Sequence, residues 1–111
     1  MLSLEIIEEN PHHILKLNGE IDASNSVELD ESMRKMIDDG AQSILVDGTH
    51  LHYISSAGLG VFMSYLEDFQ EEGIRFIIYG LSPSVWEVFK ILGLDQLISI
   101  KPDKETVIKE I

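Results

Sequence analysis

The segment Tyr53–Gly60, with the sequence YISSAGLG, places two serines between a predicted strand and a predicted helix. Before it, Ser43–Asp47 (SILVD) is a short apolar run that predicts a buried strand. After it, apolar side chains recur with a 3.6-residue period, which predicts an amphipathic helix. These side chains are Leu59, Phe62, Met63, Leu66 and Phe69. The two serines therefore stand where a helix begins, and Gly58 and Gly60 keep its first turn bare.

A serine at the start of a helix has an ordinary structural role, because its oxygen accepts a bond from an otherwise unpaired backbone N–H group. Two catalytic motifs fail on the neighbouring residues. A nucleophile elbow (G-x-S-x-G) needs glycine two positions before the serine, where this chain has Tyr53 and Ile54. A phosphate-binding loop needs a lysine that does not follow Gly58 or Gly60. The chain is therefore not expected to be an enzyme.

The length and composition restrict the kind of protein. The 111 residues suffice for one domain and leave no room for a second core. No apolar run approaches the ~18 residues that cross a bilayer, and the first ten residues carry three glutamates and no basic segment. The absence of cysteine excludes disulfides and thiolate metal sites. From these features we expect a cytoplasmic protein without cofactors.

The net charge is −12, from 20 acidic and 8 basic residues. Such a chain repels nucleic acid and anionic membranes, since binding either requires clustered lysine and arginine. We expect no nucleic-acid or membrane partner. An acidic surface favours a protein partner with a basic docking face, although the same charge also serves solubility.

The order of the remaining patterns predicts the fold. Residues 2–8 and 13–17 form a hairpin of two strands, and a helix capped by Ser24 or Asn25 follows. Beyond the serine segment come a strand at Arg75–Tyr79, a helix opened by Ser82-Pro83, a short edge strand within residues 97–100 and a helix capped by Asp103. We predict an α/β domain with a mixed, mainly parallel sheet of four to five strands and four helices packed on it. The predicted inner positions of the first and third helices are Leu29, Met33, Met36, Ile37, Val85, Val88, Phe89 and Leu92.

The residues I-S-S-A-G-L-G resemble the phosphorylation motif of the anti-sigma factor antagonists, small STAS-domain proteins related to SpoIIAA. That family has a pattern close to D-S-[ST]-G-[LI], which places the phosphoacceptor at Ser56, two residues before Gly58. Ser55 stands where the family usually has aspartate, so it is a second candidate acceptor. Ala57 stands where serine or threonine is frequent and keeps the helix entrance small. Gly19–Asp22 (GEID) also resembles a family stretch, which implies that Asp22 lies near the serine loop.

The resemblance spans nearly the whole chain and implies a STAS domain over residues 1–111. It implies a partner-switching protein that binds an anti-sigma factor of the GHKL kinase type and so releases a sigma factor. Phosphorylation of Ser56 by that kinase would end the interaction, and a PP2C-type phosphatase would reset it. A monomer is expected. The alternative is a non-switching STAS scaffold or regulatory subunit of a larger stress-signalling or transporter assembly.

The helix after the serines also predicts a docking face. If Leu59, Phe62 and Met63 face the core, Val61 and Tyr65 point outward, one turn apart and close to Ser56. We expect this pair to contact the partner. His50 and His52 are spaced to share one side of an extended segment, but no third ligand stands nearby, so loop histidines are expected rather than a metal site.

Overall fold

The fold begins with a hairpin at one edge of a five-stranded sheet. In the computed structural model, which describes residues 1–111, β1 (Leu2–Glu9) pairs antiparallel with β2 (His12–Ile21). Gly19 adopts a φ of +114°, and an added Cβ would collide with the backbone carbonyl of Met1, so only glycine fits this bulged part of β2. The predicted hairpin is therefore confirmed, with a second strand that continues four residues beyond Leu17.

The other strands extend the sheet in parallel, in the order β1-β2-β3-β4-β5. β3 (Ser43–Ile54) occupies the centre, β4 (Arg75–Tyr79) follows it, and the short β5 (Ser99–Lys101) forms the far edge. Each parallel pair is joined by a helical crossover, as parallel strands require. The predicted mixed and mainly parallel sheet is confirmed, with one antiparallel pair.

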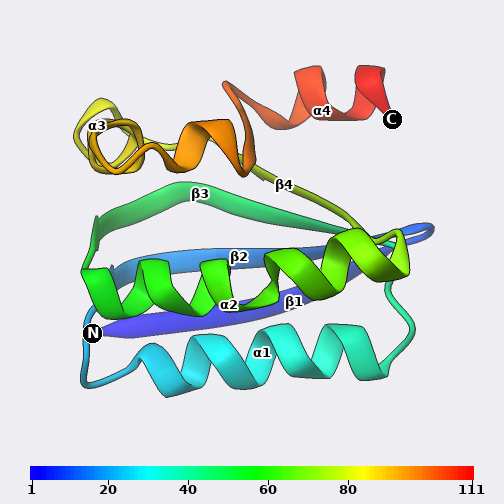
Figure 1. Ribbon diagram of the computed structural model, residues 1–111, viewed down its shortest axis with the longest axis horizontal. Coiled ribbons are helices and arrows are strands. Elements are labelled where there is room, and N and C mark those ends of the chain that lie inside the picture. The colour runs from blue at the N-terminus through cyan, green and yellow to red at the C-terminus, as the bar shows by residue number, and fades with distance from the viewer.

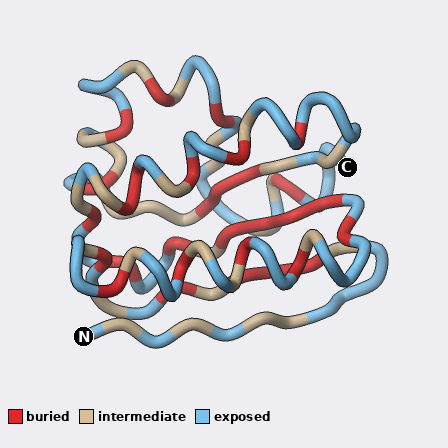
Figure 2. The backbone as a smooth tube through the Cα atoms, turned by 60° about the horizontal axis from the view of Figure 1, so that its bottom comes forward, coloured by how far each residue is buried: buried red, intermediate tan, exposed pale blue.

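Three helices share one face of the sheet. These are α1 (Ser26–Asp38), α2 (Ser56–Glu72) and α3 (Pro83–Ile91), and a short 3-10 turn, η1 (Leu94–Gln96), follows them. α1 and α2 run side by side (Figure 1), and one continuous hydrophobic cluster includes side chains of all three helices. Figure 2 shows that buried residues concentrate in the central strands and on the inner sides of the helices.

A smaller cluster lies on the opposite face of the sheet, beneath α4 (Lys104–Glu110). Its centre is Val107, which is fully buried against Ile14, Leu45 and Ile77. Asp103 caps α4 as predicted, because its carboxylate accepts the backbone N–H of Thr106 at 2.8 Å. The four helices are therefore divided three to one between the two faces.

The periodicity placed most core residues correctly. Leu29, Met33 and Met36 of α1 are fully buried, and so is Phe89 of α3. Leu92 is an exception, since α3 ends at Ile91 and the side chain of Leu92 is 57% exposed. Beyond its last helical residue the chain turns into η1, so the 3.6-residue period no longer directs that side chain toward the sheet.

The central strand is longer than predicted. β3 does not end at Asp47 but continues for seven residues to Ile54, paired along this length with β2 only. On the side of β4 the sequence GTHLHYI has no paired strand, although Gly80 and Leu81 lie beside Thr49 and Gly48. The predicted strand-to-helix loop is thus mostly strand, and His50 and His52 lie in β3 rather than in a loop.

Candidate functional site

A single residue, Ser55, connects the central strand to α2. Its backbone N–H donates to the carbonyl of Ile21 at 2.9 Å, which fixes the junction to the end of β2. Its hydroxyl oxygen accepts the N–H of Gly58 at 3.5 Å, and its carbonyl accepts the N–H of Leu59 at 3.0 Å. Ser55 is therefore the N-cap of α2, with a long side-chain bond.

Ser56 is the first residue of α2 and is exposed to solvent. Its hydroxyl has no hydrogen-bond partner within the protein, in contrast to the capping hydroxyl of Ser55. The first N–H groups of a helix lack partners inside the helix, and the helix dipole favours negative charge at this end. The position can therefore accommodate an anionic group on Ser56 without a change in the backbone.

The two glycines of the first turns have different roles. Gly58 is buried, and an added Cβ would lie 2.6 Å from Cγ2 of Ile21 and 2.9 Å from Cγ1 of Ile54. Gly60 is exposed, and an added Cβ would meet nothing within 4 Å. The absence of a side chain at Gly58 lets α2 approach the ends of β2 and β3. At Gly60 the absence of a side chain leaves the helix backbone near Ser56 uncovered.

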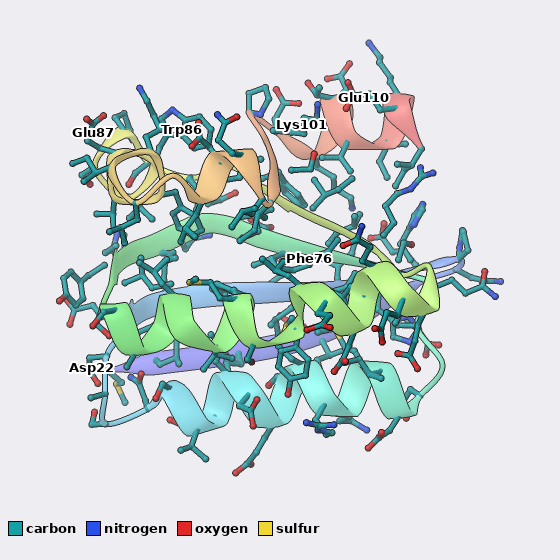
Figure 3. All side chains as sticks on the ribbon, in the orientation of Figure 1. Asp22, Phe76, Trp86, Glu87, Lys101 and Glu110 are labelled. Atoms are coloured by element: carbon teal, nitrogen blue, oxygen red, sulfur yellow. The ribbon has the colours of Figure 1, made fainter.

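Asp22 directly follows β2, at the end of the sheet where the serine junction lies. Ile21 pairs with Ile54 in the register of the parallel strands, so Asp22 and Ser55 are the next residues of adjacent strands. Figure 3 shows Asp22 at the end of the sheet where α2 begins. Its carboxylate, however, accepts the N–H and the hydroxyl of Ser24, and these bonds lower the pKa of Asp22. Asp22 thus shapes the turn before α1 and adds a negative charge close to the serines.

The predicted outward orientation of Tyr65 is wrong. Tyr65 is only 2% exposed, and its hydroxyl donates to the Asp30 carboxylate of α1 at 2.5 Å. Burial, followed by the bond to Asp30, raises the pKa of Tyr65 to about 12. The guanidinium of Arg34 lies 5.5 Å from the centre of the ring. An amphipathic tyrosine can enter the core when its hydroxyl finds a partner, and here α1 supplies that partner.

The rotation of α2 also changes the position of two other residues. Val61 is half-buried and packs against the main core, so it does not form an outer strip with Tyr65. Met63, which was assigned to the core, is 46% exposed. Residues 56, 60 and 63 follow one another at intervals of four and three, so Ser56, Gly60 and Met63 share the outer face of α2. The spacing from Ser56, rather than hydrophobicity, was the signal that could have found Met63.

The structure contains no group of three or more histidine, cysteine, aspartate or glutamate side chains arranged to hold a metal ion. None of its helices combines the length and the hydrophobicity that crossing a membrane requires. The sheet and the serine junction define a small mixed-sheet α/β domain that presents a free serine hydroxyl between a strand and a helix.

Comparison with known proteins identifies this class. Residues 3–107 match the sequence model of the STAS domain, and the chain therefore belongs to the STAS domain family. An anti-sigma-B factor antagonist of Listeria monocytogenes is 31% identical over 101 residues, which cover 90% of this chain and 89% of the relative. This relative within the family is named for its action on an anti-sigma factor.

Solved structures show the same fold. An anti-sigma factor antagonist from Mycobacterium paratuberculosis has a TM-score of 0.91 at 16% identity, covering 100% of this chain and 94% of its own. The unphosphorylated form of the anti-sigma factor antagonist SpoIIAA has a TM-score of 0.79 at 22% identity, covering 99% and 95%. The phosphorylated form of SpoIIAA from Bacillus has a TM-score of 0.71, also at 22% identity, covering 99% and 98%. The predicted STAS fold is therefore confirmed.

Proposed function

We propose that this protein is an anti-sigma factor antagonist whose binding is switched off by phosphorylation of Ser56. In this scheme the unphosphorylated protein, a cytoplasmic monomer, binds an anti-sigma factor of the GHKL kinase type and so frees a sigma factor. The kinase then modifies Ser56, and a PP2C-type phosphatase removes the phosphate. The observation that carries the proposal is the free, exposed hydroxyl of Ser56 at a junction fixed by the sheet.

The geometry favours Ser56 over Ser55 as the acceptor. The Ser55 hydroxyl is engaged as the N-cap and its residue is half-buried, so a phosphate there would remove the cap of α2. The Ser56 hydroxyl can enter a kinase active site without the loss of any bond within the protein. Among the resembling structures, SpoIIAA is known in a phosphorylated form, which is consistent with modification of a domain of this shape.

A phosphate on Ser56 would act through local charge. It adds roughly −1.5 to −2 charges to the surface, beside the carboxylate of Asp22. The start of α2 stabilises this charge within the monomer, so the domain keeps its fold. A partner surface packed against the first turn of α2 would collide with the phosphate. The phosphate would also lose water on binding, which costs free energy, so the affinity for the partner falls.

We place the docking surface on the outer face of α2 defined by Ser56, Gly60 and Met63. Met63 is an exposed apolar side chain two turns from the serine, and Gly60 leaves a flat surface between them. Substitution of Met63 by aspartate should weaken partner binding by about 1 kcal/mol or more if the side chain is an interface centre. Ile91→Asp is a control, since Ile91 is also an exposed apolar helical residue but lies on α3.

The decisive experiment combines phosphosite mapping with pull-down from the native cells. Mass spectrometry of the tagged protein should find phosphate on Ser56, at a level that changes with growth conditions. Ser56→Ala should retain the anti-sigma factor permanently, and Ser56→Asp should retain less of it. The absence of phosphate under all conditions, with equal capture by all three proteins, would support the scaffold alternative instead. Phosphate found mainly on Ser55 would refute the assignment of the acceptor.

A further inference from the structure

A second polar site lies at the opposite end of the sheet from Ser56. The first residues of three neighbouring strands stand in a row there, because His12 pairs with Ser43 and Ser43 pairs with Arg75 in the parallel register. In Figure 1 this is the end where β2, β3 and β4 begin, away from the start of α2. His12, Ser43, Arg75 and the neighbouring Gln42 line a pocket of about 320 Å³, which we call the strand-entry pocket.

The hydrogen bonds of the pocket leave several donors free. Nδ1 of His12 lies 2.6 Å from the hydroxyl oxygen of Ser43, whose side chain is nearly buried. This bond occupies Nδ1. When the Ser43 hydroxyl donates it, the neutral imidazole carries its proton on Nε2, which forms no hydrogen bond within the protein. The backbone N–H of Arg75 donates to the carbonyl of Gln42 at 3.1 Å, which fixes the backbone and leaves the guanidinium group unengaged.

Arg75 is one of two basic side chains that form neither an ion pair nor a contact with an aromatic ring, and Lys16 is the other. Of the eight basic residues, five lysines form ion pairs and Arg34 lies over the ring of Tyr65. Lys16 pairs in register with Glu5 on one side and Asp47 on the other. Arg75 forms no ion pair, although the chain has 20 acidic residues. The paired lysines are Lys35, Lys90, Lys101, Lys104 and Lys109.

We propose that the strand-entry pocket binds a small molecule that carries a carboxylate or phosphate group. A guanidinium group matches both groups with two parallel hydrogen bonds. The amide of Gln42 adds a neutral donor, and so does Nε2 of His12 when Ser43 donates to Nδ1. The volume is within the range of small-ligand sites. The net charge of −12 opposes non-specific anion binding, so the anion is held by these local donors.

The pocket is independent of the proposed phosphorylation switch. Ser43 begins β3 and Ile54 ends it, so the pocket and the serine junction lie at opposite ends of one twelve-residue strand. A ligand in the pocket does not cover Ser56 or Met63. A failure of either proposal therefore leaves the other unaffected.

The test is an NMR titration of the ¹⁵N-labelled protein with citrate and, separately, with inorganic phosphate, against sodium chloride of equal ionic strength. Saturable shifts of the amides of Gln42, Ser43 and Arg75 in the millimolar range are expected with at least one probe. Arg75→Gln should weaken that binding by about tenfold or more. Arg34→Gln, which removes the other arginine, should not change it.

The outcomes distinguish carboxylate ligands from phosphate ligands, and both from a purely structural role of the pocket residues. Binding of citrate alone assigns carboxylates to the pocket, and binding of phosphate alone assigns phosphorylated molecules. The absence of saturable shifts with both probes would overturn the proposal, and so would equal binding by Arg75→Gln and wild type. In those cases the bond between His12 and Ser43 only holds the chain together at this edge. Thermal unfolding of each variant verifies that it is folded.

Discussion

Two alanine substitutions in the same helix should change stability in opposite directions. Gly58→Ala and Gly60→Ala both replace a glycine in the first turns of α2 with the best helix former. In an isolated helix each would be stabilising. In this protein the two sites differ, because Gly58 faces the ends of β2 and β3 and Gly60 faces solvent.

The contacts determine the magnitudes. At position 60 the new methyl group meets nothing within 4 Å, so the variant should gain roughly 0.5–1 kcal/mol from reduced freedom of the unfolded chain and from helix propensity. At position 58 it would lie 2.6 Å from Ile21 and 2.9 Å from Ile54, which are both buried. Overpacking of a tight core costs about 1–3 kcal/mol, which exceeds the propensity gain. Because the propensity gain is common to both, the two variants should differ by the overpacking cost, about 1–3 kcal/mol.

Urea denaturation monitored by circular dichroism gives the free energies of unfolding of both variants and wild type. The transition midpoint should rise for Gly60→Ala and fall for Gly58→Ala, with similar slopes in all three. Equal stabilisation by both substitutions would refute the close approach of α2 to the sheet. Destabilisation by Gly60→Ala would show that the outer face of α2 is not open at this position. Partner binding can then be compared, because Gly58→Ala should also displace Ser56.

Three further predictions concern the junction and the contact between the helices. Tyr65→Phe should lower the free energy of unfolding by about 1 kcal/mol, because the hydrogen bond to Asp30 is lost while the half-buried carboxylate regains water; an unchanged denaturation midpoint would contradict this bond. Since the pKa of Tyr65 is raised to about 12 from an ordinary 10, the folded state holds this proton more tightly than the unfolded state. The stability that follows is complete below pH 10 and is lost as the pH rises from 10 to about 12. Burial also raises the pKa of Tyr79, so that residue contributes a similar loss. Tyr65→Phe should therefore reduce, without abolishing, the loss of unfolding free energy at alkaline pH that urea denaturation measures. Ser55→Ala should cost only about 0.5 kcal/mol, the low end for an N-cap, because its side-chain bond is 3.5 Å long; a loss of several times this size, by the same method, would show that Ser55 does more than cap α2.

Sequence patterns were sufficient wherever hydrophobic burial alone decides the structure. The hairpin, the order of strands and helices and the inner face of α1 follow from periodicity, because Leu29, Met33 and Met36 have no alternative to burial. The N-caps Ser82 and Asp103 were also predictable, since few residue types satisfy the free N–H groups of a helix.

The patterns failed where a polar group is stabilised by a distant partner. The extension of β3 through Thr49 and His52 depends on hydrogen bonds to β2, which no local hydrophobic pattern encodes. The burial of Tyr65 depends on Asp30, 35 residues away in the chain. These two contacts set the length of the junction and the rotation of α2, so the position of Ser56 was predictable while the residues beside it were not.

The one-residue connection between β3 and α2 has a thermodynamic consequence for recognition. The backbone of Ser55 is bonded to β2 and to the first turn of α2, so the surface around Ser56 is preorganised before a partner arrives. Binding then involves no coupled folding of this region, and the heat capacity change should reflect only the apolar area covered. Association should also be rapid and should slow as salt is added, since steering by the acidic surface of the domain is screened.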